Sequence, residues 1–235
     1  MIDIQQVASR EPLNSYAPSW DIKFGVATWE EEAKIDKLKT YLLNKEQELL
    51  KLEPKHDGGT GLGYESLTAR FGQYNLFDYA NEESTLGDLL RWLQKMYIEF
   101  VEKDNTPVED LYIICWYNSL NKGGKVESHS HGASPITYLS GNMHLDNYNT
   151  KTYYQYPYEQ HLEHQLQNKK GQVTFFPGCI FHRTDEYDGE EKRISIAFDL
   201  WQTKYFGQGE NGRLPSPLAT KTFMNKEIAN EICSS

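Results

Sequence analysis

Two histidines one residue apart, His129 and His131, lie at the start of a predicted strand in the middle of this 235-residue chain. Because successive side chains of a strand point to opposite faces, residues i and i+2 project to the same side, and both imidazoles can reach one metal ion. A third histidine, His182, follows a strand that ends in Phe-Phe-Pro-Gly. The three imidazoles are candidate metal ligands, so the fold has to be one that brings these strands together.

The segment after His182 carries an arginine and a serine that we expect on the same face as this histidine. Asp188-Gly189 is a favoured two-residue hairpin turn. If it forms the tip, residue 182 pairs with 195 and residue 184 with 193. Arg193 then lies diagonal to His182, at roughly 7–8 Å between backbones. Arg193 and Ser195 are thus predicted to face the cavity that holds the histidines.

The predicted strand 135–146 has an unusually polar face. Tyr138, Ser140, Asn142 and His144 alternate along it and share one side. Such a face is unusual in a core strand and is typical of a ligand-lined interior. Tyr138, Asn142 and His144 are therefore predicted to form the wall of the pocket.

Two further strands are predicted around the site. Residues 110–120 have the composition of a buried strand. Residues 193–201 alternate between an apolar face of Ile, Phe and Leu and a polar face that carries Arg193, Ser195, Ala197 and Asp199. We expect the apolar side to pack on helices and the polar side to line a barrel.

Two helices are predicted before these strands, over residues 28–53 and 85–103. In each, a threonine at the predicted N-cap (Thr28 or Thr85) is followed three residues later by an acidic residue, which is a capping-box pattern. Residues 1–20 are expected to be irregular, and a short strand is expected over 21–28.

Three other segments are predicted to be loops. The glycine-rich stretch HDGGTGLGY (residues 56–64) lacks the Gly-Lys-Ser/Thr of a phosphate-binding loop and is interpreted as a loop at the mouth of the site. The tyrosine-rich residues 147–170 are interpreted as an insertion that forms a lid or substrate wall, with His161 and His164 on the surface. The segment from residue 204 is interpreted as a tail that wraps the surface.

Composition narrows the class of protein. A net charge of −10 without a basic stripe argues against nucleic acid as a partner. A cytoplasmic protein is predicted from three unpaired cysteines, from the lack of an apolar run long enough for a membrane span and from the polar start after Met1.

We expect one domain over residues 1–235, with helical support over 1–106, a β core over 107–203 and a tail over 204–235.

These motifs, in this order, resemble the iron(II)- and 2-oxoglutarate-dependent oxygenases, and more closely a prolyl-hydroxylase-like subgroup predicted in bacteria and phages. The resemblance covers about residues 110–202. The residues that carry it are Gly123-Gly124, His129-Ser130-His131, Ser140-Gly141, Phe176-Pro177, His182 and Arg193-Ile194-Ser195.

The resemblance implies an α+β, mainly β fold: a double-stranded β-helix, or jelly roll, with supporting N-terminal helices. It also implies Fe(II) as metal, 2-oxoglutarate and dioxygen as co-substrates, and hydroxylation of a substrate that could be a peptide or protein. His129, His131 and His182 would hold the metal, while Arg193 and Ser195 would hold the 2-oxoglutarate carboxylate, beside Tyr138, Asn142 and His144. The family has a carboxylate where this chain has His131, so the metal has either three histidine ligands or only two.

Two alternatives remain open from the sequence. A cupin is also a double-stranded β-helix with histidine ligands, but the glutamate of its first motif is missing here and Arg193 and Ser195 would have no role. A degenerate, metal-free barrel that only binds a ligand or a protein is the other alternative. The oligomeric state is left open.

Overall fold

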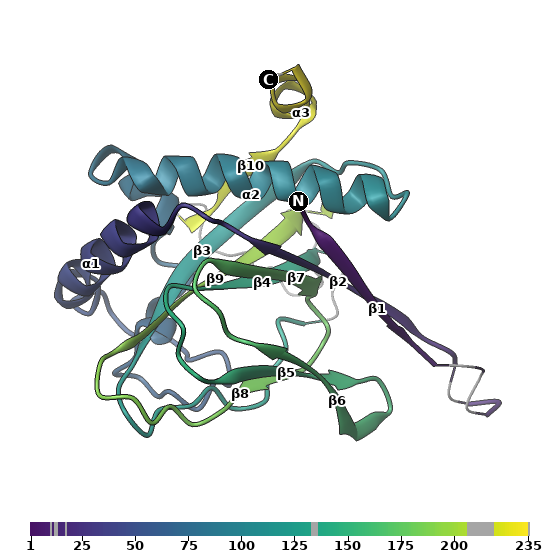
Figure 1. The fold of residues 1–235 in the computed structure, drawn as a ribbon, viewed down its shortest axis with the longest axis horizontal. Coiled ribbons are helices and arrows are strands. Elements are labelled where there is room, and N and C mark those ends of the chain that lie inside the picture. Colours follow the sequence, from purple (N-terminus) through teal and green to yellow (C-terminus); the bar gives the residue numbers. More distant parts are fainter. Residues whose placement is uncertain (10, 12–13, 17, 133–135, 206–218, 235) are drawn as a thin grey trace.

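In the described part of the chain, ten strands form two antiparallel sheets, and helices cover one of them (Figure 1). The structure, a computed structural model, describes residues 1–235 apart from 10, 12–13, 17, 133–135, 206–218 and 235. The larger sheet consists, in spatial order, of β1 (Asp3–Ala8), β2 (Asp21–Thr28), β7 (Gln172–Pro177), β4 (Thr137–His144), β9 (Arg193–Gln202), β3 (Leu111–Leu120) and β10 (Lys221–Met224).

The smaller sheet faces the larger one and consists of β6 (Glu159–Gln167), β5 (Lys151–Tyr156) and β8 (His182–Thr184). An antiparallel bridge between His129 and His182 extends it by one more segment. The chain from β3 to β9 thus passes several times between two facing sheets, which is the double-stranded β-helix, or jelly roll, expected from the sequence.

Helices cover the outer face of the larger sheet, on the side away from the smaller one (Figure 1). They are α1 (Glu32–Leu49) and α2 (Ser84–Lys103), with the short 3-10 turns η1 (Leu67–Arg70) and η2 (Leu76–Asn81) between them. A third 3-10 turn, η3 (Thr203–Tyr205), follows β9, and α3 (Lys226–Ser234) ends the described chain.

The alternation predicted for β9 is confirmed. Ile194, Ile196, Phe198 and Leu200 are completely buried, in one apolar cluster with residues of α2 such as Leu89. Burial of each such side chain contributes about 1.5–3 kcal/mol to folding. The opposite, polar face of β9 is consequently fixed toward the space between the two sheets.

Both helices are present, but neither begins with the predicted capping box. Thr28 is the last residue of β2, where it pairs with Gln172, so α1 begins only at Glu32. In α2 the carboxylate of Glu83 accepts a hydrogen bond from the backbone N–H of Thr85 at 3.0 Å. Glu83 is therefore the N-cap, and Thr85 lies inside the helix.

The hairpin predicted around Asp188-Gly189 is wrong. Strand β8 pairs with β5 (Tyr154 with His182), and β9 lies between β3 and β4 in the other sheet. Residues 185–192 link the two sheets. The pairing of 182 with 195 is excluded because both edges of β8 are occupied: on the other side His182 exchanges backbone hydrogen bonds with His129, and Thr184 N–H donates to Val126.

The segment 147–170 is not an inserted lid. It forms the hairpin β5–β6 of the smaller sheet, and β5 supplies the partner of β8. His161 is exposed, as predicted. His164 is partly buried: its ring stacks on Phe24 at 4.7 Å between centroids, and its Nε2 lies 3.0 Å from Gln5 Oε1.

Both ends of the chain add strands to the larger sheet, contrary to the prediction of an irregular start and a surface tail. Residues 3–8 pair with β2, and β10 pairs with β3. Phe223 and Met224 of β10 are completely buried. Apolar burial thus anchors the C-terminal segment, which the glycines and prolines of the preceding residues obscure in the sequence.

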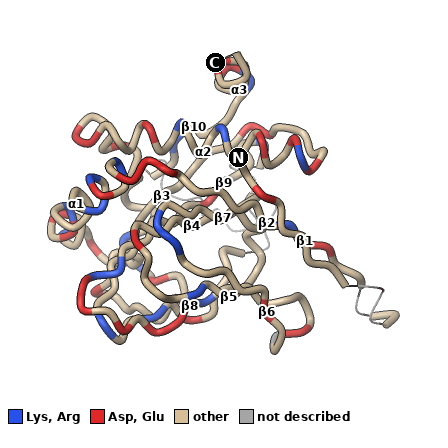
Figure 2. The backbone as a smooth tube through the Cα atoms, in the orientation of Figure 1, with Lys and Arg blue, Asp and Glu red and all other residues tan. Residues whose placement is uncertain are grey.

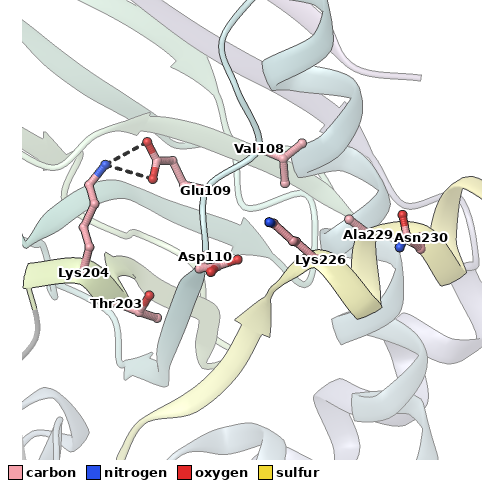
Figure 3. A pocket seen from close by; sticks show the side chains of 8 residues that line it. All are labelled: Val108, Glu109, Asp110, Thr203, Lys204, Lys226, Ala229 and Asn230. Carbon is pink, nitrogen blue, oxygen red and sulfur yellow. Dashed lines mark hydrogen bonds and ion pairs between the residues drawn. The ribbon is translucent and has the colours of Figure 1, made fainter.

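A cleft of about 360 Å³ lies where this C-terminal segment meets the end of β9 (Figure 3). Lys204 pairs with both carboxylate oxygens of Glu109 there, at 2.9 and 3.0 Å. Lys226 and Asn230 of α3 form the other wall. Its charged groups are of both signs, and it contains none of the residues singled out in the sequence.

Gly141 gives a direct test of how tightly the larger sheet packs. A Cβ at this position would overlap the ring of Phe198, its partner on β9. We expect Gly141→Ala to lower the free energy of unfolding by about 1–3 kcal/mol. Gly87→Ala is the matched control, because its Cβ would meet only Ala80 at 3.9 Å, within helix α2. That change should stabilise by up to about 1 kcal/mol. Urea titrations of both variants measure the difference, and equal effects would contradict the packing argument.

Candidate active site

The three histidines come together between the sheets. One nitrogen of each ring lies within 4.8 Å of the corresponding nitrogens of the other two. The backbone fixes this arrangement: His129 and His182 form a β-bridge, with N–H to O distances of 3.1 and 2.8 Å, and His131 N–H donates to Gly178 at 2.9 Å. The convergence expected from the sequence is therefore present, although His129 and His131 belong to a short bridge region rather than to a long strand.

Each of the three rings has its Nδ1 beside an oxygen that can only accept. His129 Nδ1 lies 2.9 Å from the carbonyl of Glu127, and His182 Nδ1 lies 3.2 Å from that of Ile180. His131 Nδ1 lies 2.8 Å from the carboxylate of Asp199. These partners favour a proton on Nδ1, and in a neutral ring this leaves the lone pair of Nε2 free, which is the tautomer that binds a metal.

The environment keeps two of the rings, those of His182 and His129, unprotonated. Burial, followed by the charge of the neighbouring histidines, lowers the pKa of His182 well below its usual value. Burial, and next to it His131, lowers the pKa of His129 to about 4. At neutral pH a cation therefore does not have to displace protons from these two rings.

Arg193 lies in the same cavity as a buried cation. Only 1% of the residue is exposed; its Nη1 donates to Thr184 Oγ1 at 3.1 Å, and its Nε has no hydrogen-bond partner among the described residues. Burial lowers its pKa to about 10, so the guanidinium remains charged at neutral pH. No carboxylate forms an ion pair with it in the described part of the chain. A buried charge without a direct counter-ion is costly, and this favours binding of an anion here.

We name the space around this cation the arginine chamber. It has a volume of about 50 Å³, and Asn142, His144, Ser195 and the three histidines contribute to its wall. His144 Nδ1 and Asn142 Oδ1 are buried without partners among the residues described. Burial, and then the charge of Arg193, lowers the pKa of His144, which is therefore neutral and available for hydrogen bonding.

Tyr138, by contrast, does not line this chamber. The register of β4 against β9 shifts between Thr137 and Leu139. Such a bulge turns the side chain of the extra residue out of the alternation. Tyr138 instead packs beside Tyr97 in the helix-side cluster. The alternation counted from the sequence holds for Ser140, Asn142 and His144 and fails at the bulge.

A second, larger space opens on the other side of the histidines, and we name it the aromatic chamber. It has a volume of about 630 Å³, which is within the usual range for ligand pockets. Its apolar wall is formed by Phe71, Trp116 and Trp201. His129, His131 and Trp116 line both chambers. The histidine cluster thus borders both a narrow polar space and a wide aromatic one.

The glycine-rich loop forms part of the mouth of the aromatic chamber, where the sequence predicted it. His56, Gly58 and Thr60 line this chamber, and Thr60 O accepts a hydrogen bond from Glu127 N–H at 2.8 Å. The buried Arg70 supports the same region by donating to backbone carbonyls, including those of Leu52 and Ser66. Arg70 is therefore structural.

Sequence reasoning missed Asp199 and the aromatic residues. The available signal for Asp199 is the alternation along β9, which predicts it on the polar face together with Arg193 and Ser195. Its contact with His131 joins β9 to a loop 68 positions earlier in the chain (199 − 131), so no local pattern could reveal it. Phe71, Trp116 and Trp201 come from three separate segments.

Comparisons with known proteins agree with this site. Residues 114–199 match the model of a family described as "Putative 2OG-Fe(II) oxygenase", and this stretch contains the three histidines, Arg193 and Ser195. This part of the chain is therefore similar to the iron(II)- and 2-oxoglutarate-dependent oxygenases, a family that uses Fe(II) and 2-oxoglutarate. The resemblance predicted from the sequence is confirmed.

Solved structures show the same fold. A prolyl-4-hydroxylase from Pseudomonas putida is 11% identical, with a TM-score of 0.52 over 76% of this chain and 92% of that one. A prolyl hydroxylase from Trichoplax adhaerens, in complex with a hypoxia-inducible-factor peptide fragment, is 10% identical, with a TM-score of 0.50 over 80% and 87%. The carbocyclase SnoK from nogalamycin biosynthesis is 10% identical, with a TM-score of 0.53 over 85% and 92%.

At these identities the likeness concerns the fold alone, and the fold carries more than one reaction. No curated protein sequence matches the chain. Among the described residues, no helix is both long and apolar enough to cross a bilayer.

Proposed function

We propose that the protein is an iron(II)- and 2-oxoglutarate-dependent dioxygenase that hydroxylates its substrate. The observation that carries the proposal is a cluster of three converging imidazoles, in one cavity with a buried arginine that lacks an anionic partner among the described residues. His129, His131 and His182 would hold Fe(II) through Nε2. Three protein ligands leave coordination positions for a bidentate co-substrate and dioxygen.

Arg193 would bind the distal carboxylate of 2-oxoglutarate. Its guanidinium offers a planar pair of donors that matches a carboxylate, and its free Nε supplies one of them. Ser195 would add a neutral hydrogen bond, and Asn142 and His144 would close the wall. When bound, Fe(II) and 2-oxoglutarate supply oxidation of a substrate C–H bond by dioxygen, with 2-oxoglutarate converted to succinate and carbon dioxide.

The substrate would approach through the aromatic chamber, because this is the wide space on the other side of the histidines. Phe71, Trp116 and Trp201 favour an apolar group over a charged one. We infer that a peptide or protein presents this group, as in the peptide complex of the Trichoplax adhaerens enzyme. Nucleic acid is disfavoured, because Lys and Arg alternate with Asp and Glu along the described helices and loops and the net charge is −10 (Figure 2).

The first test is chemical turnover without a known substrate. We expect the anaerobic iron protein to develop a charge-transfer absorbance when 2-oxoglutarate is added, and to release succinate slowly once dioxygen is admitted. Glutarate is the matched control: it keeps both carboxylates but lacks the keto group needed for chelation, so it should give neither signal. A protein that binds iron stoichiometrically yet gives no absorbance and no succinate with 2-oxoglutarate would instead fit the cupin alternative.

A further inference from the structure

Asp199 is a buried carboxylate whose polar partners belong to the site. Its Oδ1 accepts a hydrogen bond from Ser140 Oγ at 2.6 Å and lies 2.8 Å from His131 Nδ1. Only 4% of Asp199 and none of Ser140 is exposed. Within the described ranges no lysine or arginine pairs with this carboxylate. Burial of an anion is costly unless it is hydrogen-bonded and positive charge is close by, and a cation bound by His131 would supply that charge.

The charge of the metal site supplies a reason for this arrangement. A site with a carboxylate in place of His131 would lower the net charge on Fe(II) by one, whereas three neutral imidazoles leave the full double charge. We propose that Asp199, without binding the metal itself, supplies the missing negative charge through its hydrogen bond with His131. The same hydrogen bond orients the ring of His131. This inference rests on the proposed function, because it requires the histidines to bind a metal ion.

The geometry fits a positioning role and does not fit direct ligation. Among the described residues, the group of potential ligand atoms within 4.8 Å of one another contains only the three histidines. The hydrogen bond from Nδ1–H to a carboxylate makes the ring a stronger donor at Nε2. Ser140 and Asp199 are also direct partners across β4 and β9, so the sheet itself fixes the carboxylate opposite His131.

Metal titration of four proteins tests the proposal. Wild type, Asp199→Asn, His131→Asp and the double variant are titrated with Co(II) alone, without co-substrate, and followed by absorbance. Asp199→Asn keeps the shape and the acceptor oxygen but removes the charge. We expect it to weaken Co(II) binding about 10- to 100-fold in the wild-type background. In the His131→Asp background the same change should have less than about a threefold effect, because the carboxylate is then already a ligand.

Controls separate charge from general damage. Asp146→Asn removes a carboxylate that is paired with Lys39 on the surface, and it should leave Co(II) affinity unchanged. Asp199→Glu keeps the charge and should retain more affinity than Asp199→Asn. Thermal unfolding of each metal-free variant checks that the fold is intact.

Three outcomes would overturn the inference: no loss in Asp199→Asn, an equal loss in both backgrounds, or a wild-type protein that binds no metal. Only the last would also remove the proposed function. If His131→Asp itself does not bind Co(II), the Fe(III)/Fe(II) midpoint potential decides. Loss of a nearby negative charge should make this potential more positive in Asp199→Asn than in wild type, and an unchanged potential would refute the role of Asp199.

Discussion

His182→Ala is expected to abolish stoichiometric iron binding. His182 is buried in the smaller sheet, its Nδ1 is tied to a carbonyl, and its Nε2 is one of only three free imidazole nitrogens in the cluster. Loss of an outer hydrogen-bond partner already costs a metal site about 10- to 100-fold in affinity, and loss of a ligand should cost more. Anaerobic Fe(II) titration, with iron per chain measured after gel filtration, gives the result directly.

His161→Ala is the matched control, because His161 is an exposed histidine on β6 in the same sheet. It should bind iron like the wild type. His129→Ala should behave like His182→Ala, since the two residues face each other across the bridge. One iron per chain retained in either site variant would show that the cluster is not the metal site.

Arg193→Lys should lower the affinity for 2-oxoglutarate by about 10- to 100-fold while iron binding survives. Lysine keeps a positive charge but loses the planar pair of donors. A charge-assisted hydrogen bond contributes about 1.5–3 kcal/mol, which corresponds to this change for the loss of one bond. Titration of the anaerobic iron protein with 2-oxoglutarate, followed by charge-transfer absorbance, measures it.

Ser195→Ala provides the scale for this experiment. The hydrogen bond of a neutral hydroxyl contributes only about 1 kcal/mol. Ser195→Ala should therefore weaken 2-oxoglutarate binding less than Arg193→Lys does.

Arg193→Met is expected to have two effects. The metal-free protein should be at least as stable as wild type, since a buried unpaired charge is removed, and 2-oxoglutarate binding should be lost. Equal 2-oxoglutarate affinities of wild type and Arg193→Lys would contradict the assignment.

The parts of the fold that sequence could predict are those governed by local periodicity. The two faces of β9 follow from strict alternation, and the apolar face meets the helices as expected. Alternation also placed Asn142 and His144 in the cavity, and it failed at Tyr138 because a bulge is not visible in the pattern. The histidine cluster was accessible because spacing and motif order both pointed to it.

Strand pairing was the main error, and its cause is the competition between local and distant partners. Asp188-Gly189 is a strong local turn signal, yet β8 already has β5 on one edge and His129 on the other. A jelly roll repeatedly sends the chain from one sheet to the other, so neighbours in sequence are frequently not neighbours in space. Arg193 still meets the site because it reaches across the gap between sheets to Thr184.

The division of the histidines between the layers has a mechanical consequence. His129 and His182 are held by the smaller sheet, whereas His131 is tied through Asp199 and Ser140 to β9 and β4 of the larger one. An ion bound by all three histidines would therefore connect the two sheets. Separating the layers would then require breaking metal–ligand bonds, so the free energy of ion binding would add to the resistance of the barrel to opening.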